Sequence, residues 1–390
     1  MKKIKILSLL FCLVMLMVAC HDEEKPVPVG GRTVLMYLVG DNNISSDIYA
    51  NIGSVERGLA DVTSPGTFVI YWDGGKRKSE FPVPTLFKYR VDGKGKVSQK
   101  EIIKTYADNQ NSVSKEVITR VLRDVATCCP SENYGLIFGS HATGWLPVGK
   151  SRSFGDDAGN KINIPDLSEA LSQSDIHFDF ILFDACLMSQ VEVVYELRNV
   201  ADYLILSPAE VLSAGFPYFK MTKYLLDAGH TEQNVVNAAK GFIDYYKNES
   251  AYSWATIAVI KTDEIQALAN ITNSIMGLYQ DNLVKFDKNK MDYFQTDYGY
   301  GRYELSHSTF DFRAFIRELT DDNIPPYFEE QLERVVIYKD YVDGYKLVNI
   351  NSQIYSGIGC YIPDIRYSNW NAYFKSLQWY SAAGWNKTEW

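Results

Sequence analysis

Short apolar runs alternate with helix-like segments over the first two hundred residues, and this alternation is the strongest constraint on the fold. The predicted strands are 32–40, 67–72, 84–91, 134–138, 178–183 and 203–206, and the predicted helices are 47–62, 112–127, 165–173 and 191–197. Strands that alternate with helices are typical of crossover connections, so the pattern predicts an α/β fold with a mostly parallel central sheet flanked by helices. In such sheets, functional residues gather beyond the carboxyl ends of the strands.

The pattern becomes less regular after about residue 220. Helical and aromatic-rich segments follow, with strand-like runs at 256–261 and 354–362. Because the chain is longer than one average domain, we expect an α/β domain over 32–220 and a C-terminal region, 221–390, that packs on it.

The N-terminus carries lysines followed by an apolar run, Ile6–Ala19, that is too short to span a bilayer comfortably. It predicts a signal peptide over 1–19. The end of this segment, 17–20, resembles the lipobox of bacterial lipoproteins, which implies an acylated Cys20, a lipid bilayer as partner and a linker over 20–31. The acidic run after Cys20 is similar to an export tag of surface lipoproteins, so the expected location is the outer membrane. The alternative to acylation is an ordinary signal peptide followed by a chance cysteine. The alternative to an export tag is an acidic linker that is simply solvated.

Charge and cysteine content exclude several classes of protein. The formal net charge of −9 becomes −12 without residues 1–19, because three lysines and no acids are removed, and this argues against a nucleic-acid partner. The six cysteines show neither zinc-site spacing nor the density of a disulfide scaffold. Cys128 and Cys129 fall at a predicted helix end and are expected to pack. We expect a monomer that requires no cofactor or metal, with calcium dependence left open.

Two strand ends carry residues suited to chemistry. The run YGLIFGSHATGW places His141 just past one strand, and FILFDACLMS places Cys186 just past another, 45 residues later. A cysteine nucleophile reacts as the thiolate and needs a neighbouring group that exchanges protons. The alternatives are a hydrogen-bonded loop histidine and a buried core cysteine. The other histidines, at positions 21, 177, 230 and 307, are given structural roles.

Several blocks resemble the clostripain family of cysteine peptidases. They are 32–43, Ser-His-x-x-Gly-Trp at 140–145, Asp-Ala-Cys-Leu-Met at 184–188, Ser-Pro-Ala-Glu at 207–210, and 356–363. The resemblance implies a caspase-like fold in which 32–220 is the peptidase domain. It also implies a catalytic dyad of His141 and Cys186, with an oxyanion hole formed by the backbone of Ala142 and Cys186. Caspase-like enzymes usually have glycine at the position of Ala142; alanine keeps the N–H, but positive φ there would be costly.

Asp184, two residues before Cys186, is a candidate determinant of substrate specificity. Alternation along the strand puts Asp184 and Cys186 on related sides of the chain, so Asp184 can line a pocket beside the nucleophile. The resemblance implies that Asp184 contributes to an acidic S1 pocket and that peptide or protein substrates are cleaved after Arg or Lys. Glu210, past the next strand, is a second candidate acid. The alternative for Asp184 is a cap on a helix beginning near Leu187.

The segment between the two blocks is a candidate processing site. Residues 149–161, GKSRSFGDDAGNK, are rich in Gly, Ser and Asp and are expected to form an exposed loop. Lys150, Arg152 and Lys161 offer cleavage sites to an Arg/Lys-specific enzyme, and the resemblance implies a zymogen activated by cleavage between the blocks. A surface loop open to any trypsin-like protease is the alternative.

Two other functions compete with a peptidase. Residues 144–151 match the P-loop pattern G-x-x-x-x-G-K-[ST], but Pro147 lacks an N–H and 152–160 show no helical periodicity, so nucleotide binding is disfavoured. The 27 tyrosines and 7 tryptophans also suit a non-catalytic surface lipoprotein that binds peptide or glycan.

Overall fold

A nine-stranded sheet forms the centre of the molecule in a computed structural model that describes residues 30–75, 80–146, 153–288, 291–294, 309–343 and 350–388. The strand order is β12-β10-β9-β8-β5-β1-β2-β3-β4. The strands are β1 (Arg32–Val39), β2 (Pro65–Asp73), β3 (Thr85–Asp92), β4 (Glu101–Thr105), β5 (Asn133–Gly139), β8 (Phe178–Asp184), β9 (Ala201–Leu206), β10 (Trp254–Lys261) and β12 (Val336–Asp343). The signal peptide, Cys20, Lys150, Arg152 and His307 lie outside the described residues.

The middle of the sheet is parallel. β2, β1, β5, β8 and β9 pair in parallel, whereas β3 and β4 on one side and β10 and β12 on the other are antiparallel. The carboxyl ends of β1, β5 and β8 therefore meet at one edge of the sheet, which we call the carboxyl edge.

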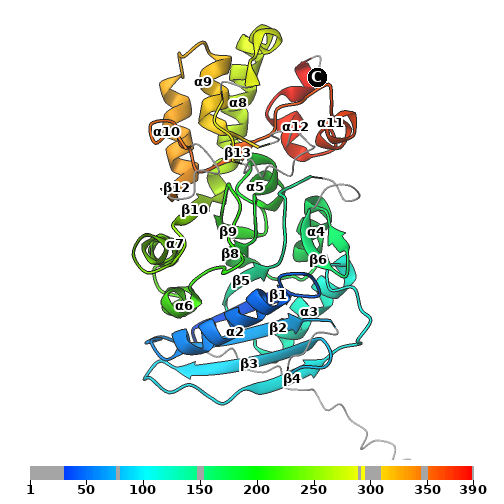
Figure 1. Ribbon diagram of the computed structural model, residues 1–390, viewed down its shortest axis with the longest axis vertical. Coiled ribbons are helices and arrows are strands. Elements are labelled where there is room, and N and C mark those ends of the chain that lie inside the picture. The colour runs from blue at the N-terminus through cyan, green and yellow to red at the C-terminus, as the bar shows by residue number, and fades with distance from the viewer. Residues whose placement is uncertain are drawn as a thin grey trace, which may run out of the picture.

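Helices cover both faces of the sheet (Figure 1). Along β1, Val34, Met36 and Leu38 pack on one face, and Leu35 and Tyr37 on the other, as the two-residue period of a strand requires. The first face is covered by α2 (Ser45–Leu59), α6 (Tyr218–Leu226) and α7 (Thr231–Asn248). The second is covered by α3 (Lys115–Cys128), α4 (Ile164–Ser172), α5 (Val191–Leu197), α8 (Ile265–Tyr279), α9 (Phe312–Leu319) and α10 (Pro326–Val335). Two short helices, α11 (Ser368–Phe374) and α12 (Gln378–Ala382), follow.

The predicted α/β fold with a mostly parallel sheet is confirmed. Two edge strands, β4 and β12, were not predicted, and β10 and β12 extend the same sheet beyond residue 220. The strand expected over 354–362 is wrong: only Gly359–Cys360 (β13) is extended and pairs with Phe310–Asp311 (β11), because Gly357 takes a positive φ of 77°. In the described part of the chain, no helix is both long and apolar enough to cross a membrane.

The segment expected as an exposed loop contains a hairpin. Its strands are β6 (Phe154–Asp157) and β7 (Asn160–Ile162), with Phe154 and Asp157 buried. Asp157 accepts a hydrogen bond from the Ser112 N–H at 2.6 Å, which ties β6 to the segment before α3. The loop prediction is therefore wrong for these residues, and the half-buried Lys161 lies in a paired strand.

Candidate active site

His141 and Cys186 follow neighbouring parallel strands at the carboxyl edge. Gly139 of β5 pairs with Asp184 of β8, and the two candidate catalytic residues each lie two positions beyond that pair. The Ser140 N–H donates to the Asp184 carbonyl at 3.4 Å, so the strands stay together up to the residues preceding the site. The sheet register thus brings the predicted pair to one place, with both side chains partly exposed.

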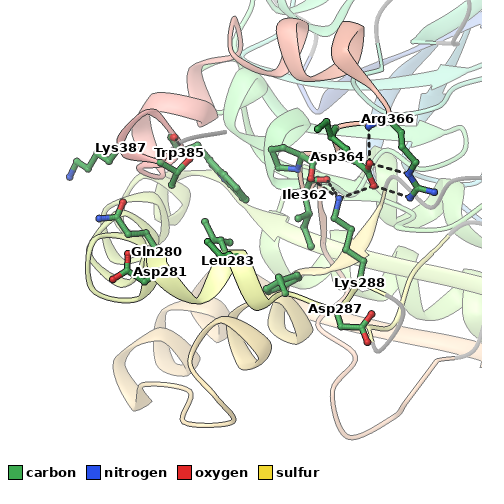
Figure 2. A pocket seen from close by; sticks show the side chains of 15 residues that line it. Gln280, Asp281, Leu283, Asp287, Lys288, Ile362, Asp364, Arg366, Trp385 and Lys387 are labelled. Atoms are coloured by element: carbon green, nitrogen blue, oxygen red, sulfur yellow. Dashed lines mark hydrogen bonds and ion pairs between the residues drawn. The ribbon is translucent and has the colours of Figure 1, made fainter.

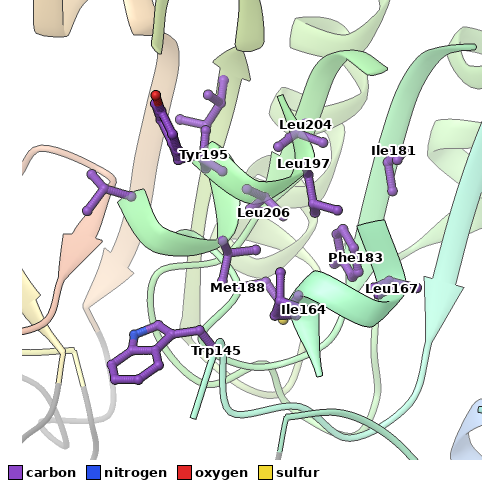
Figure 3. Close-up of a cluster of buried hydrophobic side chains, with 14 of the residues drawn as sticks. Trp145, Ile164, Leu167, Ile181, Phe183, Met188, Tyr195, Leu197, Leu204 and Leu206 are labelled. Atoms are coloured by element: carbon purple, nitrogen blue, oxygen red, sulfur yellow. The ribbon is translucent and has the colours of Figure 1, made fainter. Parts of the chain in front are cut away.

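The hairpin holds the loop that carries His141. The Gly155 N–H donates to the His141 carbonyl at 2.8 Å, and the Thr143 N–H donates to the Ser153 carbonyl at 2.9 Å. Trp145, which ends this loop, is buried in the same cluster as Phe183 of β8 (Figure 3). Hydrogen bonds on one side and a buried indole on the other fix the backbone at the histidine.

Ala142 keeps its N–H out of this pairing. It forms an isolated antiparallel bridge with Phe154, and the bridging hydrogen bonds come from the flanking residues Gly155 and Thr143. Ala142 is absent from the described residues that have positive φ. The backbone conformation at this position therefore carries no penalty for a Cβ, and the departure from glycine causes no strain.

The loop that carries Cys186 is held in a constrained conformation. Leu187 has a positive φ of 58°, which is unusual for a bulky residue, and its N–H donates to the Ala209 carbonyl at 2.9 Å. Met188 is buried in the cluster of Figure 3. The Val211 N–H donates to Cys186 Sγ at 3.3 Å. As a thiol, Cys186 also donates from Sγ to the Val211 carbonyl at 3.7 Å, so the backbone of Val211 holds the sulfur in place.

Asp184 is buried beside the cysteine loop. One carboxylate oxygen, Oδ2, accepts hydrogen bonds from the Tyr218 hydroxyl at 2.9 Å, Asn51 Nδ2 at 3.2 Å and the Phe216 N–H at 3.4 Å. Burial raises the pKa of Asp184 to about 6, and these three hydrogen bonds oppose the increase. The capping alternative is wrong, because α5 begins at Val191 and its N-cap is Gln190.

The remaining acid and basic candidates within the described residues are Glu210, next to the Val211 that contacts Cys186 Sγ, and Lys161. Glu210 is half-buried, and its carbonyl accepts a hydrogen bond from the Trp254 indole at 3.0 Å. Lys161 lies in β7 on the far side of the hairpin turn. Among the described residues, no cluster of three or more His, Cys, Asp or Glu side chains is arranged to hold a metal ion.

One contact at the site was missed in the sequence. Asn43, which follows β1, has its Oδ1 atom 2.7 Å from His141 Nε2, and this amide oxygen accepts the hydrogen bond. Asn43 lies four positions past the end of β1 at the same edge, and a polar residue beyond a buried strand is the signal that identified His141 and Cys186. Asparagine is also common in turns, so this signal is weak by itself.

The P-loop match does not lie in a phosphate-binding context. Gly144 has a positive φ of 70°, and a Cβ there would lie 2.4 Å from Gln190 Nε2, so this glycine is required by packing against the cysteine loop. The described residues after the motif form β6, whereas a phosphate cradle needs a helix.

A cavity of about 880 Å³ lies between the 3-10 helix η2 (Gln280–Lys285) and the C-terminal segments (Figure 2). Within it, Lys288 Nζ donates to the Ile362 and Pro363 carbonyls and to Asp364. Asp364 also accepts from Arg366. None of the candidate catalytic residues is among those that line it, and Asp364 partners both Lys288 and Arg366 (Figure 2).

The fold and the site together define the class of the protein: an α/β peptidase with histidine and cysteine at adjacent strand ends. The model of the clostripain family matches residues 36–390. The chain therefore belongs to the clostripain family and is a cysteine endopeptidase. No curated protein sequence matches it.

Solved structures of the same family confirm the caspase-like α/β fold. A secreted C11 cysteine protease from Bacteroides thetaiotaomicron, solved with an irreversible peptide inhibitor, is 30% identical with a TM-score of 0.76, and the match covers 92% of this chain and 100% of the other. An inactive zymogen C11 protease from Parabacteroides distasonis is 31% identical with a TM-score of 0.73, covering 92% and 99%. A further structure of a secreted C11 cysteine protease from B. thetaiotaomicron, iotapain, is 26% identical with a TM-score of 0.74, covering 92% and 100%.

Proposed function

We propose that this peptidase cleaves peptide bonds after Arg or Lys, with Cys186 as the nucleophile and His141 as its proton-transfer partner. The observation that carries the proposal is the register of β5 on β8, in which Gly139 pairs with Asp184. His141 and Cys186 therefore each lie two residues beyond a paired position on neighbouring strands. The Cys186 thiolate attacks the scissile carbonyl. His141 then protonates the leaving amine, and water hydrolyses the thioester.

The backbone N–H groups of Ala142 and Cys186 form the oxyanion hole in this proposal. The Ala142 N–H takes no part in the bridge to Phe154, which supports its use as a donor. Donors of this kind stabilise the negative charge that develops on the carbonyl oxygen in the transition state.

Asp184 supplies the charge that selects a basic P1 side chain, with Glu210 as the second acid. All three hydrogen bonds of Asp184 go to Oδ2. Oδ1 is the acceptor we assign to the substrate. A charge-assisted hydrogen bond from a guanidinium or ammonium group contributes roughly 1.5–3 kcal/mol.

The chain is made as a zymogen in this proposal and cuts itself between the two blocks. Lys150 and Arg152 are the favoured sites, because cleavage at Lys161 would require β7 to separate from β6. The P. distasonis relative is described as an inactive zymogen, which supports a precursor form in this family. The two fragments stay associated, since β5 and β8 are paired in one sheet.

We expect purified wild-type protein to run as two fragments on a denaturing gel and the Cys186→Ala variant as one chain. A chain in which Lys150 and Arg152 are both replaced by glutamine should also stay intact, and it serves as the control for the cleavage site. A wild-type protein that remains a single chain with full activity would refute self-activation.

Acylation of Cys20 anchors the enzyme to the outer membrane in this proposal, with 20–31 as the tether. The support is the sequence around Cys20, together with β1 beginning at Arg32 immediately after the linker. Two of the solved relatives are described as secreted, which places their activity outside the cytoplasm.

Peptide cleavage distinguishes this function from the alternative of a non-catalytic binding lipoprotein. Fluorogenic peptides that differ only at P1, with Arg, Lys, Leu or Asp, should be cleaved when P1 is basic. The absence of turnover on every peptide by the processed protein would favour the binding role, and cleavage after Asp would contradict the assigned pocket.

A further inference from the structure

Three neighbouring strands deliver three side chains to the carboxyl edge in order. Asn43 follows β1, His141 follows β5 and Cys186 follows β8, and the sheet order β8-β5-β1 places the histidine's strand in the middle. His141 Nε2 lies 2.7 Å from Asn43 Oδ1. The asparagine thus contacts the histidine from the side opposite the cysteine's strand.

The chemistry of this contact fixes the state of the imidazole. An amide oxygen only accepts hydrogen bonds, so with Oδ1 facing the ring, Nε2 must carry the proton. A neutral imidazole has one N–H, so Nδ1 is then the unprotonated nitrogen. Asn43 therefore selects one tautomer and one ring orientation.

Asn43 is itself held by the residue before it. Asn42 Nδ2 donates to the Val39 carbonyl at 3.0 Å and to the Asp156 carbonyl at 2.9 Å, and Asn42 Oδ1 accepts from the Ile44 N–H at 3.0 Å. Asp156 belongs to β6, the strand whose Gly155 N–H donates to the His141 carbonyl. The hairpin therefore anchors both partners of the contact, and their separation is set by backbone hydrogen bonds.

We propose that Asn43 is a positioning residue for His141, which holds Nε2 protonated and leaves Nδ1 to exchange the proton with Cys186. This inference rests on the proposed dyad. A neutral amide orients the ring without the full negative charge of a carboxylate, which would stabilise the imidazolium and raise its pKa.

Two substitutions test the proposal. Asn43→Ala should lower kcat roughly 10- to 100-fold with little change in KM, because the loss of an orienting partner affects the histidine and not substrate binding. Asn43→Asp is isosteric and keeps the acceptor while adding a charge. It should retain much of the activity but move the alkaline limb of the pH–rate profile upward by about one unit.

The chain contains a matched control. His177 Nε2 lies 2.7 Å from Asp202 Oδ1, a contact of the same length that is made to a carboxylate and lies at the amino ends of β8 and β9. Asp202→Ala should leave both kcat and the pH profile unchanged. A general effect of losing a surface histidine contact would therefore appear in this variant too.

A measurement independent of turnover completes the test. In the Cys186→Ala chain, NMR titration of His141, assigned by loss of its signal in His141→Ala, should give a higher pKa when Asn43→Asp is added. Wild-type kcat and an unshifted profile in both Asn43 variants, together with an unshifted NMR titration, would overturn the role of Asn43. Retained turnover in Cys186→Ala would instead overturn the dyad, so the two failures are distinguishable.

Discussion

Replacement of Cys186 by alanine is expected to abolish peptidase turnover while the chain keeps its fold. The change removes the nucleophilic sulfur, so the thioester cannot form, and the expected loss is on the order of 10⁴-fold or more in kcat. Cys186 is only partly buried and alanine is close in volume, so thermal unfolding should change little. Activity on a peptide with a basic P1 residue and a thermal melt on the same preparation measure both effects.

Cys128 provides the matched control for this variant. It is an exposed cysteine at the end of α3, which precedes β5, and so it lies toward the amino end of that strand. Cys128→Ala should keep full turnover and full labelling by a cysteine-directed Arg or Lys probe, whereas Cys186→Ala loses both. His141→Ala should reduce turnover nearly as much as Cys186→Ala. Wild-type turnover in either site variant would show that the dyad is assigned to the wrong residues.

The central strands could be predicted because they are buried on both faces. β1, β5 and β8 consist of continuous apolar runs, since a parallel strand in the middle of a covered sheet has no polar side. The same argument located the site, because polar residues directly after such runs must lie at the carboxyl edge. His141 and Cys186 were found in this way.

The edge strands could not be predicted for the converse reason. β4 is largely exposed and its residues are mostly polar, so only its pairing with β3 makes it a strand. The hairpin of β6 and β7 is short and rich in Gly and Asp, which is typical of a loop. It is fixed by contacts to the histidine loop and to Ser112, and no local pattern encodes such contacts.

Contacts between side chains that are far apart in the sequence could not be predicted either. Asn43 and His141 are 98 positions apart, and Asp184 is held by Asn51 of α2 and by Tyr218 of α6. Alternation along β8 predicted on which side Asp184 lies, but the identity of its partners depends on how α2 and α6 pack on that face.

Replacement of Asp184 by asparagine is expected to remove the proposed preference for basic P1 residues. Loss of a charge-assisted hydrogen bond should raise KM for Arg and Lys substrates roughly 10- to 100-fold, with a smaller effect on kcat. Asp202→Asn removes one carboxylate from an exposed position at the amino end of β9, and it controls for the change in net charge. Unchanged KM for basic substrates in Asp184→Asn would show that another acid, with Glu210 the first candidate, selects P1.

The raised pKa of Asp184 adds a pH signature to this prediction. Burial raises that pKa to about 6, so the carboxylate is charged at pH 7 and becomes neutral as the pH falls through 6. KM for an Arg substrate should therefore rise between pH 7 and pH 5 in the wild type, and this rise should be absent in Asp184→Asn.

Ionisation of Asp184 also opposes folding. With an ordinary pKa of 3.8, the unfolded chain loses the proton first, so stability decreases between pH 3.8 and 6, by up to roughly 3 kcal/mol. Above pH 6, Asp184→Asn should consequently be more stable than the wild type to urea while losing specificity. A carboxylate that is retained at a cost to folding is expected where its charge binds a substrate.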